Sequence, residues 1–268
     1  MNRIIERFQS LRASGSKAFV AYIGAGDPNL EVTRALALAF DAAGVDVLEL
    51  GVPFSDPLAD GLVNQLAAQR GLASGTTPAR VLEAVARIRR ESSIPIVLYL
   101  YFNLLHRVGV DHFIAEAAKA GVDGLLVLDL PPEEADDYER LMKDAGLCAI
   151  WLVAPTTPED RIARIAARGS GFLYYVSREG VTGMQSTIAD TMGAKVARIR
   201  AHTTLPIAVG FGVSNADQAR TVAAAGDGVV VGSAIVSRIA QHGDSPELVG
   251  EVARFVQDLV AAVHRPRD

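Results

Sequence analysis

Residues 43–61 read Ala-Gly-Val-Asp-Val-Leu-Glu-Leu-Gly-Val-Pro-Phe-Ser-Asp-Pro-Leu-Ala-Asp-Gly. After Asp46 the residues Val47, Leu48 and Leu50 are apolar and, in part, β-branched, which is typical of a buried strand. One carboxylate, Glu49, interrupts the run, and a buried ionised carboxylate is costly unless it is paired. The strand leads into a loop that Pro53 and Pro57 stiffen and that reaches a second acid, Asp60. The stretch therefore predicts one acid on a rigid strand and another on a stiff loop beyond the strand's carboxyl end.

The first four residues of that stretch belong to a repeat. Ala-Gly-Val-Asp recurs at 120–123 and, shortened to Ala-Gly-Asp, at 225–227, each time before an apolar run. A second pattern, an aliphatic residue followed by Pro-Ile, opens apolar runs at 94–96 and 205–207. With three further runs, strands are expected to start near residues 18, 46, 94, 123, 147, 171, 205 and 227, with helical patterns in the gaps.

This alternation predicts an α/β fold, a (β/α)8 TIM barrel that forms a single domain over residues 1–268. Strands this apolar are buried on both faces, which indicates a parallel sheet. Residues 2–12 have helical apolar spacing and predict an extra N-terminal helix, and 245–263 predict a closing helix. A doubly wound open sheet is the structural alternative. No Gly-x-Gly-x-x-Gly pattern follows the first strand, which makes that alternative less favoured.

Composition narrows the class of protein. The chain has 26 basic and 31 acidic residues, a net charge of −5, which argues against nucleic acid and provides no basic patch for a membrane. Its only cysteine is Cys148, so an internal disulfide is impossible and a reducing, cytoplasmic location is expected. The first residues carry charges and no long apolar run, so neither a signal peptide nor a membrane span is expected there.

Chemistry in a barrel lies at the carboxyl ends of the strands. None of the four lysines follows a strand, only His106 among the histidines is near a strand end, and Cys148 stands at a strand's start. Schiff-base chemistry and a metal site are therefore not expected, and acid–base chemistry by carboxylates is. The candidates are Glu49, Asp60 and Asp129. Alternatively, Glu49 is a satisfied core acid, Asp60 a helix cap, and Asp129 a turn residue.

Two glycine-containing turns predict a phosphate site. Val-Gly-Phe-Gly-Val-Ser at 209–214 ends the seventh strand, and Val-Gly-Ser at 231–233 ends the eighth. Glycine lets backbone N–H groups approach an anion, and a helix N-terminus favours its charge. The alternative is that these glycines only make tight turns. A polar loop at 177–186 contains two glycines and is typical of a mobile lid.

These residues resemble one family, the tryptophan synthase alpha subunits. Glu-Leu-Gly-Val-Pro-Phe-Ser-Asp-Pro-Leu-Ala-Asp-Gly at 49–61 is similar to the family's signature. Further matching motifs occur in order along nearly the whole chain, at 25–28, 101–103, 129–134, 174–183 and 210–213. Four positions depart from the family's pattern, namely Gly24, Leu62, Asn64 and Leu128. The resemblance implies a TIM-barrel lyase that cleaves indole-3-glycerol phosphate into indole and glyceraldehyde 3-phosphate.

The resemblance also implies roles for individual residues. Glu49 would move protons between indole C3 and the glycerol hydroxyl, and Asp60 would stabilise positive charge at the indole N–H. Phosphate would be held by Gly183, Gly212, Gly232 and Ser233. The indole pocket would be walled by Tyr22, Tyr101, Leu126, Tyr174 and Phe211, and Thr182 would lie on the lid and help to order Asp60.

A partner is implied as well. The resemblance implies pairing with a beta subunit in an alpha2beta2 heterotetramer, through Pro53, Asp56 and Pro57. It implies no cofactor in this chain and pyridoxal phosphate only in the beta subunit. Docking would order the 52–60 loop and a lid over 177–190 together. The alternatives are a free-standing indole-releasing lyase, a phosphate-sugar isomerase or another synthase on a related barrel, and a non-catalytic regulatory subunit.

Overall fold

Eight parallel strands form a closed barrel in the order of the sequence, with β1 paired to β8. The computed structural model describes residues 1–176 and 185–264, with side chains for 1–176 and 192–264. The strands are β1 Ala18–Gly24, β2 Val47–Gly51, β3 Ile96–Leu100, β4 Gly124–Val127, β5 Cys148–Val153, β6 Leu173–Val176, β7 Ile207–Gly210 and β8 Gly228–Val231. The predicted barrel is confirmed, and each strand begins within two residues of its expected start. Its description as a single domain stays a prediction.

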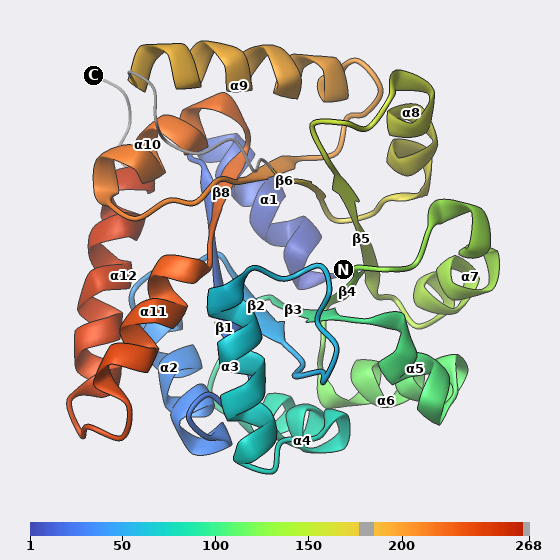
Figure 1. Ribbon diagram of the computed structural model, residues 1–268. Coiled ribbons are helices and arrows are strands. Elements are labelled where there is room, and N and C mark those ends of the chain that lie inside the picture. The colour runs from blue at the N-terminus through green and yellow to red at the C-terminus, as the bar shows by residue number, and fades with distance from the viewer. Residues whose placement is uncertain (177–184, 265–268) are drawn as a thin grey trace.

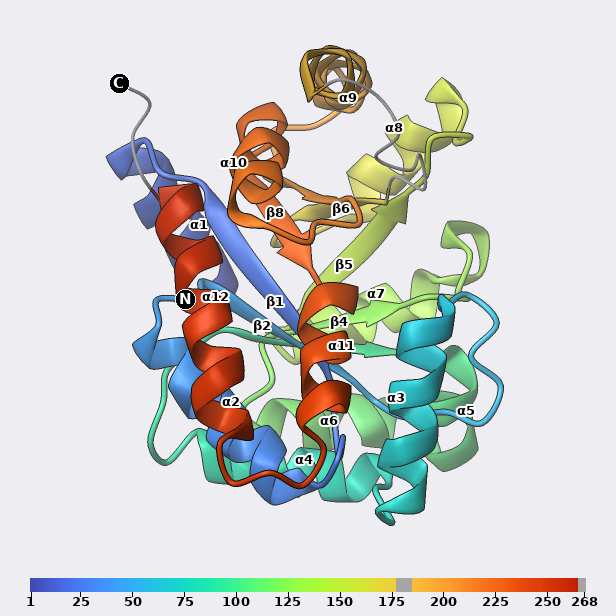
Figure 2. The same cartoon turned by 60° about the vertical axis from the view of Figure 1, so that its left-hand side comes forward.

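Helices surround the barrel as an outer ring, except α1, which lies across one end of the barrel (Figure 1). They are α1 Arg3–Ser14, α2 Leu30–Ala42, α3 Leu62–Ala73, α4 Pro78–Ile88, α5 Phe102–Val108, α6 Val110–Ala120, the short 3₁₀ helix η1 Pro132–Glu134, α7 Asp136–Asp144, α8 Glu159–Arg168, α9 Gln185–Arg200, α10 Ala216–Ala225, α11 Ser233–His242 and α12 Leu248–His264. Helix α9 lies beside α8 and α10 in both views (Figures 1 and 2). None of the helices within residues 1–176 and 185–264 has the length and hydrophobicity of a membrane span.

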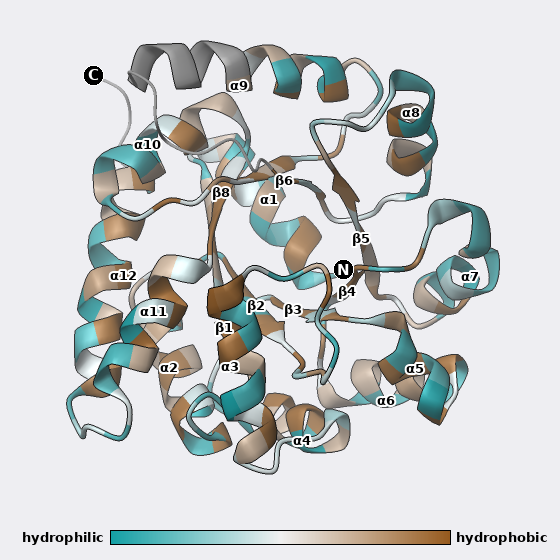
Figure 3. Cartoon of the chain, in the orientation of Figure 1, coloured by the Kyte–Doolittle hydropathy of each residue, from teal (hydrophilic) through white to brown (hydrophobic). Residues whose placement is uncertain are grey.

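Strand residues alternate between two hydrophobic layers, since successive side chains point to opposite faces. On β2, Leu48 and Leu50 pack outward against the helices, whereas Val47 joins the cluster inside the barrel. The strand ribbons are mostly hydrophobic in Figure 3, and the surrounding helices carry hydrophilic residues as well. This alternation directs Glu49, two positions after Val47, to the barrel interior.

The aspartate of the Ala-Gly-Val-Asp repeat has a structural task. Asp46, Asp123 and Asp227 each accept a hydrogen bond from the N–H near the start of the preceding strand, with distances of 2.6, 2.8 and 2.8 Å. The backbone N–H of each aspartate donates in return to the carbonyl of the same partner residue. The repeat therefore fixes the register of β1–β2, β3–β4 and β7–β8 at the end of the barrel opposite the strands' carboxyl ends.

The N-terminal helix covers that same end. Ile4 and Phe8 of α1 join the interior cluster, and the ring of Phe8 lies 5.3 Å from that of Phe172. Cys148, the first residue of β5, is buried in this layer, and burial raises the pKa of its thiol to about 12. Cys148 is thus a core residue at the start of its strand, away from the carboxyl ends.

Two expected boundaries are wrong. The closing helix starts at Leu248 and not at residue 245. The polar loop proposed as a lid ends earlier than residue 186 or 190, because α9 already begins at Gln185. The helical spacing of the buried residues Met192, Val196 and Ile199 explains how tertiary packing supports this helix. Residues 177–184 lie outside the described part of the chain.

Candidate active site

A cavity of about 1090 Å³ opens at the carboxyl ends of the strands. Its wall includes Glu49, Asp60, Tyr99 and Tyr174 together with the glycine turns after β7 and β8. The cavity is large enough for a drug-sized ligand, and this end of a barrel is where active sites form. The lining combines aromatic rings, two carboxyl groups and exposed backbone.

Glu49 lies at the inner face of β2 and is only 1% exposed. Within the described residues, neither of its carboxyl oxygens has a hydrogen-bond partner. Burial raises the pKa of the Glu49 carboxyl to about 8, and the nearby charge of Asp60 adds to this rise. A pKa close to neutrality suits a group that must both donate and accept a proton. The alternative of a satisfied core acid does not agree with these unpaired oxygens.

Asp60 is held by two phenol groups. The hydroxyl of Tyr99 donates to Oδ1 and that of Tyr101 donates to Oδ2, each over 2.8 Å. The Tyr101 hydroxyl in turn accepts the backbone N–H of Ala59 at 3.0 Å. Asp60 is not the N-cap of α3, because Gly61 occupies that position without a side-chain cap. Its carboxylate is therefore directed toward the barrel and not toward the helix.

Glycines at the strand ends make room for the aromatic walls. A Cβ on Gly51 would lie 2.3 Å from the hydroxyl oxygen of Tyr22, and one on Gly210 would lie 2.8 Å from that of Tyr174. The rings of Tyr22 and Tyr99 meet edge to face, with centroids 5.1 Å apart. Burial raises the pKa of these tyrosines, which keeps their phenols protonated. Flat apolar faces and proton-donating edges thus line one pocket.

Three of the phosphate-site candidates border the same cavity. Gly212 follows β7 with a φ of 28°, a backbone conformation that side chains rarely adopt. Gly232 caps α11, and Ser233 is the first residue of that helix. Free backbone N–H groups at a helix N-terminus attract anions. Gly183 and Thr182, the other two residues expected near phosphate and Asp60, lie outside the described residues.

The remaining pocket residues differ in position. Phe211 lines the cavity, whereas Leu126 is fully buried inside the barrel and does not border it. Leu128, two residues further along, lines the cavity instead. The carboxylate of Asp129 accepts the backbone N–H of Phe102 at 2.6 Å, which agrees with its structural reading as a turn residue.

The three residues expected at a partner interface differ in their exposure to solvent. Asp56 is exposed and Pro57 half-buried, but Pro53 is buried and packs close to Gly71 of α3. Pro53 therefore shapes the loop and presents no surface. Sequence reasoning missed the exposed apolar side chains beside it, Leu58 at 92% and Leu62 at 69% exposure. No sequence signal marks these two leucines as exposed, because other apolar residues, such as Phe54 and Val63, stand near them.

Tyr99 is the functional candidate that sequence reasoning missed inside the site. Its signal is the alternation of β3, since Val97 faces the barrel interior and residues at intervals of two share that face. Tyr99 and Tyr101 are therefore placed one above the other. Tyr99 lies two residues before the motif at 101–103, which includes Tyr101 and to which the family resemblance pointed.

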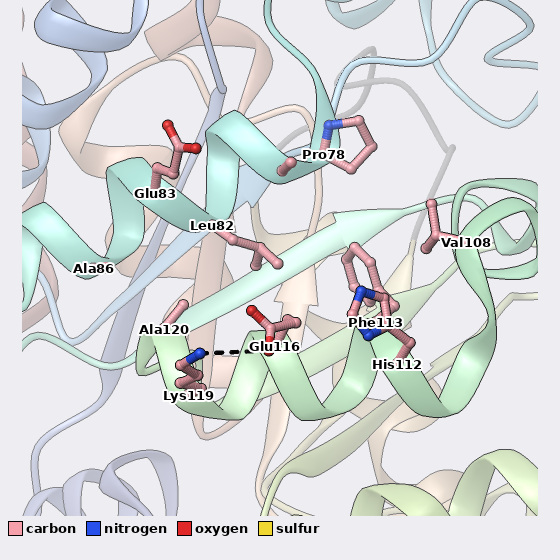
Figure 4. A pocket seen from close by; sticks show the side chains of 11 residues that line it. Pro78, Leu82, Glu83, Ala86, Val108, His112, Phe113, Glu116, Lys119 and Ala120 are labelled. Carbon is pink, nitrogen blue, oxygen red and sulfur yellow. Dashed lines mark ion pairs between the residues drawn. The ribbon is translucent and has the colours of Figure 1, made fainter.

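A second cavity lies outside the barrel, between α4 and α6 (Figure 4). It measures about 380 Å³, and two of its charged residues, Glu116 and Lys119, pair with each other at 3.7 Å. It does not contain the combination of buried acid, phenols and glycine turns that the first cavity has. Within residues 1–176 and 192–264, no group of three or more His, Cys, Asp or Glu side chains could hold a metal ion.

Comparisons with known proteins agree with this geometry. A family model described as "Tryptophan synthase alpha chain" matches residues 8–264. A protein of that name from Opitutus terrae is 53% identical, covering 99% of this chain and 100% of its own. Another from Citrifermentans bemidjiense is 48% identical, covering 98% of each.

Solved structures show the same likeness. The tryptophan synthase alpha subunit of Legionella pneumophila superposes with a TM-score of 0.91 at 36% identity, covering 98% of both chains. A chain of the tryptophan synthase complex from Pyrococcus furiosus has a TM-score of 0.83 at 36% identity, covering 92% of this chain and 99% of that one.

Proposed function

The chain belongs to the tryptophan synthase alpha chain family, and we propose that Glu49 and Asp60 carry the reaction of that family in this barrel. The enzyme is a carbon–carbon lyase that cleaves indole-3-glycerol phosphate to indole and glyceraldehyde 3-phosphate, and the indole goes to the beta subunit. The observation that supports the assignment is a buried, unpaired Glu49 facing the same cavity as Asp60.

Glu49 begins the reaction as an acid. With a pKa of about 8, most of the carboxyl groups are protonated at neutral pH. Transfer of this proton to indole C3 makes that carbon tetrahedral and places positive charge on the ring. The bond between C3 and the glycerol carbon then breaks, and the hydroxyl proton of the glycerol moiety returns to the Glu49 carboxylate. The electrons of the broken bond restore the indole, and the aldehyde forms on the glycerol fragment.

Asp60 stabilises the charge that this protonation creates. The cation carries its positive charge largely at the ring N–H, and a fixed carboxylate beside that group lowers the barrier to reaching it. Two phenols hold the carboxylate, so little reorganisation is needed during the reaction. Tyr22, Tyr174 and Phe211 would enclose the flat ring.

Phosphate would be bound by backbone N–H groups around Gly212, Gly232 and Ser233, with Gly183 as a further candidate. The supporting observation is that α11 begins at Ser233 on the cavity rim. Glycerol phosphate should bind there, as calorimetry can measure. A Gly232→Val variant should lose this binding, whereas an anion found at the opposite end of the barrel would contradict the assignment.

The catalytic assignment is tested by indole release from the purified chain. Glu49→Gln should reduce turnover by at least about 10²- to 10⁴-fold, the usual effect of removing a proton-transfer group. Asp60→Asn should also reduce turnover strongly while glycerol phosphate still binds. Near-normal turnover in either variant would refute its role. Loss of glycerol phosphate binding in Asp60→Asn would make Asp60 a structural residue.

We further propose that the loop before Asp60 docks the beta subunit, within an alpha2beta2 heterotetramer. Asp56, Leu58 and Leu62 present an exposed acid and two exposed apolar side chains near the cavity mouth. Apolar side chains beside charge are typical of interfaces. This chain itself needs no cofactor in the proposed mechanism, and pyridoxal phosphate would belong to the beta subunit.

The docking proposal predicts coupling between the partner and cleavage. Turnover should rise roughly 5- to 150-fold on addition of beta subunit, the range that about 1–3 kcal/mol of coupling provides. Asp56→Ala and Leu58→Ser should reduce this rise without changing turnover of the isolated chain. Full turnover alone, unchanged by the partner, would favour a free-standing lyase.

A further inference from the structure

The two oxygens of the Asp60 carboxylate are bound by tyrosines that differ in their other contacts. Tyr101 both donates to Asp60 and accepts the N–H of Ala59, so its hydroxyl joins two parts of the same loop. Tyr99 donates to Asp60 from within strand β3, whereas Tyr101 follows the end of that strand. We propose that Tyr99 is a positioning residue for cleavage, which fixes the plane of the Asp60 carboxylate toward the indole N–H.

The backbone of Tyr99 is firmly placed. The residue lies within β3, and its carbonyl accepts the backbone N–H of Val52 at 2.9 Å, which links β3 to the start of the loop after β2. Its ring is fixed from the other side by edge-to-face contact with Tyr22. A hydroxyl on this rigid strand gives Asp60 an anchor that does not depend on the conformation of its own loop.

The chemistry of the pair makes Tyr99 a permanent donor. Burial, and then the charge of Asp60, raise the pKa of the Tyr99 phenol well above its usual value, so the hydroxyl keeps its proton. A carboxylate has about four lone-pair positions, and the two phenols occupy one on each oxygen. Acceptor positions therefore remain for the substrate. With Tyr101 alone, the carboxylate could rotate about its single remaining hydrogen bond.

The two tyrosines that hold the Asp60 carboxylate, Tyr99 and Tyr101, both belong to this chain. Asp60 is thus oriented before any partner binds, and docking has less to order in this part of the site. The inference rests on the proposed role of Asp60, and its test must separate the two. Tyr99→Phe removes the hydroxyl and retains the ring against Tyr22. Tyr138→Phe is a matched control, because it removes a buried hydroxyl from α7, outside the site.

Tyr99→Phe should lower kcat roughly 10- to 100-fold, which is the usual net value of a hydrogen bond to a charged group expressed as a rate. KM should change less than about threefold, because the lost interaction acts in the transition state. Tyr138→Phe should leave kcat unchanged. In an Asp60→Ala background, Tyr99→Phe should have no further effect, measured by single-turnover indole release.

Each other outcome has a definite meaning. Normal turnover of Tyr99→Phe, with Asp60→Ala impaired, would overturn the inference alone. Normal turnover of Asp60→Ala would overturn the proposed role of Asp60. An equal loss from Tyr99→Phe in both backgrounds would mean that Tyr99 acts independently of Asp60. A crystal structure of Tyr99→Phe should show the Asp60 carboxylate rotated; an unchanged carboxylate would also overturn the inference.

Discussion

Glu49→Gln should stabilise the folded chain while it abolishes cleavage. The Glu49 carboxyl has a pKa of about 8 in the folded chain, against 4.5 for an ordinary glutamate carboxyl, which represents the unfolded chain. The folded state therefore binds this proton more tightly than the unfolded state does. Stability from this group is fully present below pH 4.5 and is lost as pH rises through about 8. Glutamine cannot ionise, so the variant avoids the loss.

The size of the effect follows from the two pKa values. Ionising Glu49 completely in the folded chain costs about 5 kcal/mol, since each pKa unit corresponds to about 1.4 kcal/mol. Between about pH 5.5 and pH 8.5, the advantage of the variant should grow by about 3 kcal/mol. This is a large fraction of the total stability of an ordinary domain.

Urea unfolding of both proteins at the two pH values measures this difference directly. Glu83→Gln is the matched control, because Glu83 is an exposed carboxylate on α4, and its substitution should give the same change at both pH values. A stability difference between Glu49→Gln and the original chain that does not grow with pH would refute the tightly bound proton. It would also remove the basis for starting the reaction with Glu49 as an acid.

Three further outcomes are expected. The kcat/KM for indole release should fall as pH rises through about 8, because Glu49 must start protonated; a profile that rises there would contradict this order of proton transfers. Gly51→Ala should lower the free energy of unfolding by about 1–3 kcal/mol, because the new Cβ would meet Tyr22. Gly250→Ala, which has open space around its Cβ in α12, should not lower it, as urea unfolding can check. Cys148 should resist a thiol reagent in the folded chain and react in denaturant; rapid reaction without denaturant would contradict its burial and raised pKa.

The barrel was predictable because its signals are local. Each strand is a short apolar run, and three of the eight are preceded by an aspartate whose hydrogen bonds proved to set the strand register. The boundary of α9 was not predictable from the polar character of 177–186, because buried contacts of residues further along the helix support its packing. Local composition competes there with tertiary packing, and packing decides the structure.

The candidate site was predictable where an acid interrupts an apolar strand. Glu49 and Asp60 stand out by charge, and the glycines after β7 and β8 by their place in the barrel. The orientation of Asp60 was not predictable, because its partner Tyr99 is distant in sequence and looks like an ordinary strand residue. Which of Leu126 and Leu128 borders the cavity was not predictable either. The depth of a side chain along the barrel depends on the register of neighbouring strands, which the local sequence does not specify.

The close fit of Gly51 to Tyr22 and of Gly210 to Tyr174 restricts how this pocket can evolve. Any side chain at either glycine would collide with the facing tyrosine, so a first substitution there is harmful unless the aromatic residue has already become smaller. A smaller aromatic partner, in turn, leaves a gap in the pocket wall until the glycine is replaced. The two members of each pair are therefore epistatic, and a lineage that changes the pocket's shape must pass through a poorly packed intermediate.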